Sequence, residues 1–311
     1  MGHAFSSADS MLILDETTKQ THSATHAATR INASLNLNFE YDAATGTAVL
    51  KASSQEPPLK VVRAFIVEDG SVLVHVHNVS GGLLGGDQLA MSLEIGESAH
   101  VQVTTTGATR IYRSRADADP ATQRIDVRVA QNACLEYLPD SLIPFAGSRF
   151  TQRTTIHLDA GAGLFWWEVL APGREARGEL FAYDAVEMKT DIFALGSPIA
   201  IERVRVEPRL YPVASPARLG KYRYWATFYI CRVGPEPGEW LALEQHLRDV
   251  ARELSPAADA LWGISTLPAH GIICRCLAVC GRDALAGLHK LWRAAKFTLY
   301  GTEAIPPRKV N

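Results

Sequence analysis

The chain has 311 residues, of which 47% are hydrophobic and 21% are charged, and its formal net charge is −2. This composition is typical of a globular protein with a sizeable core. The near-neutral charge and the lack of a long Lys/Arg run exclude nucleic acid and anionic membrane surfaces as expected partners. The five cysteines are odd in number and three of them crowd into residues 274–280, so we expect reduced thiols in a cytoplasmic protein.

The first 30 residues are polar and show no periodicity, which predicts a flexible N-terminal tail. Their one apolar run, residues 11–14, is too short for a signal peptide. Further along, no apolar stretch approaches the ~20 residues of a membrane span. We therefore expect residues 31–311 to form a single β-rich domain that works in the cytoplasm.

Period-two alternation is the main pattern from about residue 32 to residue 233. In four runs, every second residue is apolar: 72–77, 89–95, 100–104 and 124–129. This pattern is typical of half-buried antiparallel strands with one apolar face and one wet face. Since turn signals separate these runs and long helical patterns are absent, the sequence predicts a mainly β fold, built as a large antiparallel or mixed β assembly.

The last third of the chain changes to helical spacing. Apolar residues recur every three or four positions over about 239–254 and again over 282–296, which predicts two helices near the C-terminus. Between them, residues 261–267 and 271–279 are predicted as two short strands.

A glycine-rich segment stands out at residues 75–87. It contains Gly81, Gly82, Gly85 and Gly86, and it ends at Asp87. Such glycines permit positive φ and close backbone approach, so a tight turn packed against another segment is favoured over a phosphate site, for which no Gly-Lys-Ser/Thr follows.

Two histidines precede this segment, His75 and His77. They share one face of a strand, about 7 Å apart. They are either a metal-ligand pair or an ordinary hydrogen-bonded pair.

Two carboxylates lie among apolar neighbours. Asp140 falls within residues 137–145, and Glu168 follows the aromatic run 164–167. A carboxylate in such surroundings is costly to bury unless it is paired, protonated or bound to a cation. Two interpretations stay open: structural ion pairs with Arg149, Arg174 or Arg110, or carboxylates that line an internal passage for a cation.

Three cysteines, Cys274, Cys276 and Cys280, would share one face of a strand. No partner at structural-zinc spacing lies nearby, so we interpret them as small buried core residues.

Sequence signatures of hydrolase, zinc-protease and nucleotide-binding sites are missing. The chain is therefore predicted to be a binding protein and not an enzyme.

Taken in order, several segments resemble the blocks of the urease accessory protein family UreD, also called UreH. These segments are His77–Asp87, Ala99–Ser114, Leu135–Asp140, Ile143–Gly147, Trp167–Arg174, Gly178–Phe181, Leu291–Arg293 and Ile305–Arg308. Any one block is a weak match, but the ordered set is specific.

This resemblance implies a β-superhelical body with two helices and a part in nickel insertion into apo-urease. The implied partners are UreF-like and UreG-like accessory proteins and the urease subunits, with paired copies of this chain. It implies no permanent cofactor and only transient Ni(II), with Asp140 and Glu168 lining a nickel tunnel. Asp87, His77 and Arg110 are weaker candidates. The alternative is an adaptor that positions the GTPase without contacting nickel.

Overall fold

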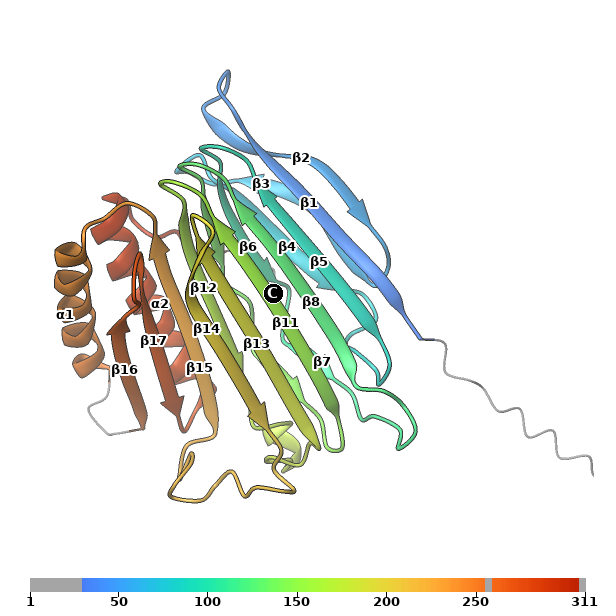
Figure 1. Ribbon diagram of the computed structural model, residues 1–311. Helices are drawn as coiled ribbons and strands as arrows, with labels where there is room; N and C mark the ends of the chain where they lie inside the picture. Colours follow the sequence, from blue (N-terminus) through green and yellow to red (C-terminus); the bar gives the residue numbers. More distant parts are fainter. Residues whose placement is uncertain (1–29, 255–258, 308–311) are drawn as a thin grey trace, which may run out of the picture.

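A computed structural model describes residues 30–254 and 259–307, so the tail predicted over 1–30 lies almost entirely outside the described residues. Two β-sheets pack face to face (Figure 1). The first sheet has the strand order β14 (Ser197–Val206), β13 (Ala185–Ala194), β11 (Arg149–Leu158), β8 (Ala121–Val129), β5 (Gln88–Ile95), β1 (Asn32–Asp42) and β2 (Thr47–Gln55).

The second sheet lies behind the first in Figure 1. Its main path runs β16 (Ala260–Thr266), β17 (Gly271–Ala278), β15 (Tyr224–Arg232), β12 (Gly163–Leu170), β9 (Cys134–Tyr137), β6 (His100–Thr105), β4 (Val72–Asn78) and β3 (Leu59–Ile66). Two short strands, β7 (Thr109–Ile111) and β10 (Leu142–Pro144), join this sheet at β12.

From β4 to β13 the long strands alternate between the two sheets, so the chain winds as a superhelix. Because one full turn separates neighbours in the same sheet, they run parallel: β5 beside β8, β8 beside β11, and β6 beside β9. Antiparallel pairs occur toward the sheet ends, as between β13 and β14 or β12 and β15. The predicted mainly β, mixed assembly is confirmed, but the prediction of antiparallel pairing is wrong for the central strands.

Burial alternates along the central strands of the first sheet, as the period-two pattern predicts. The inward side chains of β5, β8 and β11 meet those of the second sheet in one core. In contrast, β12 is buried at every position, because Trp166 faces the core between the sheets while Trp167 faces the helices. Half-burial is therefore the wrong prediction for β12. The half-burial predicted over residues 72–77 and 100–104 is likewise wrong, because Val72–Val76 of β4 and Val101–Thr104 of β6 are buried at every position.

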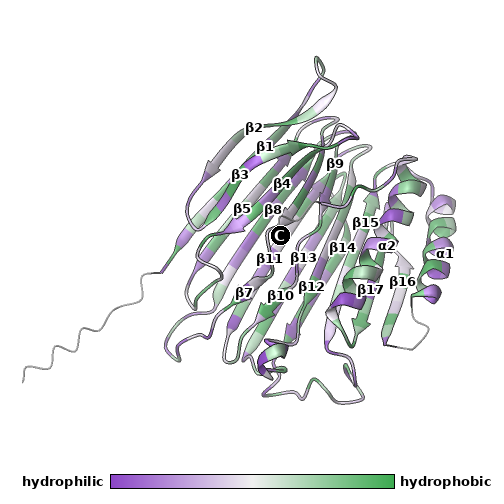
Figure 2. Ribbon diagram, turned by 180° about the vertical axis from the view of Figure 1, so that it is seen from behind, coloured by the Kyte–Doolittle hydropathy of each residue, from purple (hydrophilic) through white to green (hydrophobic). Residues whose placement is uncertain are grey.

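Two α-helices cover the outer face of the second sheet at one end, over β15, β16 and β17 (Figure 2). They are α1 (Pro237–Glu253) and α2 (Gly281–Tyr300), which confirms the two predicted helices. Helix α2 continues four residues beyond its predicted end and stops at Gly301, whose φ of 67° is the left-handed conformation that ends many helices. No helix among the described residues has the length and apolar character to cross a membrane.

Cys274 and Cys276 are buried beneath these helices, as predicted for core residues. The prediction that Cys280 shares their strand face is wrong, because β17 ends at Ala278 and Cys280 directly precedes α2.

A buried ion pair fastens α2 to the second sheet. The Lys296 ammonium lies 2.6 Å from the Glu136 carboxylate in β9 and 3.3 Å from that of Asp69, and both Lys296 and Glu136 are only 7% exposed. Burial by itself lowers the pKa of Lys296, but the two carboxylates outweigh it and the pKa is raised. Gln102 donates hydrogen bonds to Glu136 and to the carbonyl of Ile305, so the C-terminal segment joins the same network.

Candidate functional site

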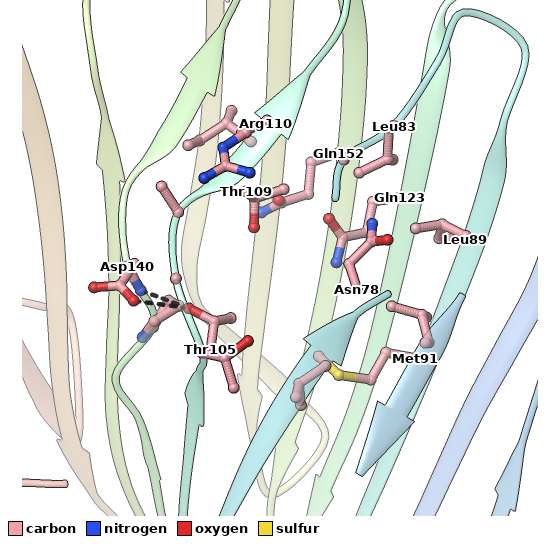
Figure 3. A pocket seen from close by; sticks show the side chains of 18 of the residues that line it. Asn78, Leu83, Leu89, Met91, Thr105, Thr109, Arg110, Gln123, Asp140 and Gln152 are labelled. Carbon is pink, nitrogen blue, oxygen red and sulfur yellow. Dashed lines mark hydrogen bonds between the residues drawn. The ribbon is translucent and has the colours of Figure 1, made fainter. Parts of the chain in front are cut away.

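A cavity of about 240 Å³ lies between the two sheets, near the glycine-rich turn and β7 (Figure 3). Its first-sheet wall comprises Leu89, Met91, Gln123, Gln152 and Met188. Five residues predicted from the sequence also line it: Asp140, Glu168, Arg110, Gly81 and Gly82. The fold therefore brings together both carboxylates and one of the weaker candidates, from segments far apart in the chain.

Glu168 lines this cavity as a buried residue, and its side chain is held by polar groups of the opposite sheet. Gln152 in β11 and Thr190 in β13 both donate hydrogen bonds to its carboxylate. Burial raises the pKa of Glu168 to about 7, although these hydrogen bonds act in the opposite direction. The carboxyl group can therefore gain or lose its proton near neutral pH.

Within the described residues, no ion pair joins Glu168 to a cation. Two of the arginines considered as partners are engaged elsewhere: Arg149 donates to backbone carbonyls and Arg174 pairs with Glu179. The interpretation of Glu168 as one half of an arginine ion pair is therefore wrong for these two candidates. A buried carboxylate that accepts hydrogen bonds only from neutral groups and lines a cavity can instead bind a mobile cation.

Asp140 is half-buried at the same cavity and is fixed by Thr105 of β6. The Asp140 N–H donates to the Thr105 hydroxyl oxygen at 2.9 Å, and the hydroxyl lies 3.4 Å from the carboxylate (dashed lines in Figure 3). Arg110 lines the cavity from β7. The cavity is thus lined by two carboxyl groups and one guanidinium group, together with amide and hydroxyl groups.

The glycine-rich segment forms a tight turn that packs against β7, as predicted. Leu83 N–H donates to the Arg110 carbonyl at 2.8 Å, and Tyr112 N–H donates to the Leu83 carbonyl at 2.8 Å. A Cβ atom on Gly82 would lie only 2.5 Å from that Arg110 oxygen, so no side chain fits there. Gly81 and Gly82 line the cavity, whereas Gly85 and Gly86 are not among its lining residues.

Gly82→Ala is expected to lower the free energy of unfolding by about 1–3 kcal/mol, because the new methyl group overlaps a hydrogen-bonded backbone carbonyl. Denaturant unfolding of the purified protein measures this change. Gly107→Ala is the matched control, since Gly107 lines the same cavity and nothing lies within 4 Å of the point that its new methyl group would occupy. Equal stability of the two variants would contradict the packing argument.

Asp87 and His77 are not among the residues that line the cavity. Asp87 is buried and accepts hydrogen bonds from the N–H groups of Ile31 and Leu84, which secures the turn to the start of β1. Burial and the neighbouring His75 lower the pKa of His77. Among the described residues, no group of three or more His, Cys, Asp or Glu side chains is placed to hold a metal ion.

The fold and the site together define a superhelical β scaffold with a carboxylate-bearing cavity between its sheets. Comparison with known families shows which scaffold this is: the family described as UreD urease accessory protein matches residues 32–311. The chain belongs to this family, which confirms the resemblance found in the sequence.

Individual relatives agree with this assignment. The chain is 48% identical to the urease accessory protein UreD of Herpetosiphon aurantiacus over 261 residues, covering 84% of this chain and 91% of the relative. It is 33% identical to that of Pseudomonas fluorescens strain Pf-5, covering 90% and 95% of the two chains. It is 34% identical to that of Pseudomonas aeruginosa strain PAO1, covering 81% and 85%. All three are named as accessory proteins of urease.

Proposed function

We propose that this chain is a scaffold and conduit that passes Ni²⁺ through the cavity between its sheets to apo-urease. In this role it joins a UreF-like protein and a UreG-like GTPase to the urease subunits in the cytoplasm. The observation that supports the proposal is the buried Glu168 carboxylate, which faces the cavity and is held by Gln152 and Thr190 instead of an arginine.

The ligand chemistry suits passage better than storage. Nickel binds tightly to assembled sets of nitrogen and sulfur ligands, so a delivery route must avoid a complete cage. The described residues hold no such cage, whereas the cavity offers single carboxylates, amides and hydroxyls. Carboxylates along the route also reduce the desolvation cost of a doubly charged ion inside a protein.

Glu168→Gln and Asp140→Asn are each expected to lower the nickel content of urease at least fivefold, because each replaces a carboxyl group of the cavity by a neutral amide that cannot ionise to bind a cation. The variants are co-expressed with the urease subunits and the other accessory proteins, and nickel per urease active site is measured by atomic spectroscopy. Pull-down of the accessory complex checks that assembly is unchanged. Glu97→Gln, in an exposed turn, is the matched control.

Full nickel loading by both variants, with the complex intact, would remove the conduit role. The chain would then act as an adaptor that positions the GTPase and has no contact with nickel.

A further inference from the structure

A row of polar side chains continues from Glu168 across the second sheet. Glu168 in β12 lies directly opposite Thr227 in β15, and Thr227 lies directly opposite Arg275 in β17. Opposed residues on neighbouring strands share a face, with Cβ atoms about 4.5–5.5 Å apart. Glu168, Thr227 and Arg275 therefore form one continuous polar row on the face that looks toward the first sheet.

A second polar row lies on the first sheet. Thr154 in β11 is paired with Thr190 in β13, and Thr190 is paired with Glu202 in β14. The two rows touch at two points: Thr190 donates to Glu168 at 3.3 Å, and the Arg275 guanidinium lies 2.6 Å from the Glu202 carboxylate. Tyr229 in β15 also donates to Glu202, at 3.3 Å. Most side chains in the core between the sheets are apolar, so this polar strip is distinct from its surroundings.

The strip leads from the interior to the surface. Thr190 and Thr227 are buried, the Glu202 side chain is 18% exposed and that of Arg275 is 50% exposed. This gradient arises because the first sheet ends at β14, whereas the second continues from β15 into β17 and β16 (Figure 1). The Glu202–Arg275 pair therefore lies at the open rim of the two sheets.

Thr227 gives a second sign that the strip holds something polar. Its hydroxyl is buried and has no hydrogen-bond partner within residues 30–254 and 259–307. Buried hydroxyl groups in folded proteins nearly always have a partner. None of the residues that line the cavity comes from β14, β15 or β17, so the strip beyond Glu168 is closed in this structure.

We propose that this strip is a closed side branch of the cavity, with Glu202 as a second binding carboxylate for a divalent cation and Arg275 as its gate. The proposal rests on the proposed passage of Ni²⁺ past Glu168. When Arg275 swings away, the Glu202 carboxylate is free to take a cation that arrives between Thr190 and Thr227. The Arg275 guanidinium is half exposed, so water screens its charge and weakens its pairing with Glu202, which eases this opening.

The gate is tested first without urease, by the accessibility of a cysteine placed in the strip. Thr227→Cys is introduced together with Cys280→Ser into the full-length chain. This chain is purified in its complex with the UreF-like accessory protein. A small cationic methanethiosulfonate is the probe. The native thiols of Cys134, Cys231 and Cys276 serve as internal controls, because burial raises the pKa of each to about 12 and keeps it unreactive.

Adding Arg275→Ala is expected to speed labelling of the Thr227→Cys thiol at least tenfold while the native thiols stay unlabelled. Arg203→Ala, which removes a different β14 ion pair, is expected to leave the rate unchanged. Equal labelling rates with and without Arg275 would overturn the gate. Faster labelling of Cys134 or Cys231 in the same variant would also overturn it, since the fold as a whole would then have loosened.

Nickel delivery separates this inference from the proposed function. Glu202→Gln is expected to lower the nickel content of urease at least threefold, in the same co-expression assay as Glu168→Gln. Loss of nickel with Glu168→Gln but not with Glu202→Gln would leave the passage standing and overturn the side branch. Full nickel loading with both variants would overturn the passage itself.

Discussion

Replacing Lys296 with methionine is expected to lower the free energy of unfolding by about 3–5 kcal/mol. The Lys296 ammonium lies 2.6 Å from Glu136, and each side chain is only 7% exposed. Methionine fills a similar volume but leaves the Glu136 carboxylate buried without its cation, which is among the costliest single changes in a protein interior. The loss is read from denaturant unfolding followed by circular dichroism.

Two further variants test the cause of this loss. Lys290→Met changes an exposed lysine on the same helix and is expected to shift stability by less than about 0.5 kcal/mol. The double variant Lys296→Met/Glu136→Leu removes both charges and is expected to recover much of the loss, because a buried ion pair and an apolar pair are often similar in stability. A double variant as unstable as the single one would show that the helix contact itself, and not the unpaired carboxylate, is the cause.

The sequence predicted the elements of this fold better than it predicted their pairing. Period-two alternation marks strands, and the three- to four-residue spacing marked α1 and α2 to within a few residues. Alternation does not say which strand lies beside which, since the pattern of inward and outward side chains is the same in parallel and in antiparallel pairs. The parallel pairs come from the winding of the chain between two sheets, which no local pattern encodes.

The candidate site was also predictable only in part, because the sequence marks single residues but not their neighbours in space. Asp140 and Glu168 were found because a carboxylate among aromatic and aliphatic residues is unusual in any sequence. Their surroundings were not found: Gln152 and Thr190 belong to strands of the opposite sheet, and the row from Glu168 to Arg275 depends on the register of three strands. Local sequence around Thr227 or Arg275 contains no signal for that register.

Glu168 is expected to make the protein less stable as the pH rises from about 4.5 to about 7. Its pKa in the folded chain is about 7, against an ordinary value of 4.5. Below pH 4.5 the carboxyl group is protonated in both the folded and the unfolded chain. Between the two values the unfolded chain has lost the proton that the folded chain retains, so the free energy of unfolding falls as the pH rises. Above pH 7 the loss stays constant, on the order of 3 kcal/mol.

Denaturant unfolding of the wild type and Glu168→Gln between pH 4.5 and 8 measures this effect. Glutamine keeps an oxygen for the Gln152 hydrogen bond but has no proton to lose, so the variant is expected to gain stability relative to the wild type as the pH rises. Glu253→Gln, at an exposed position on α1, is the matched control and is expected to follow the wild type. Parallel pH profiles for wild type and Glu168→Gln would mean that the folded carboxyl group titrates in its ordinary range.

The same proton competes with nickel. A carboxylate must be ionised to bind a cation, so nickel binding that depends on Glu168 is expected to weaken about tenfold for each pH unit below 7. Equilibrium dialysis of Ni²⁺ against the accessory complex at pH 6, 7 and 8 measures this dependence, and Glu168→Gln is expected to abolish it. With a pKa near 7, a proton and a cation compete for the carboxylate at neutral pH, so this single group can release nickel again, which a route needs and a storage site does not. Binding that is equally strong at pH 6 and pH 8 would place the nickel at other ligands and leave Glu168 outside the route.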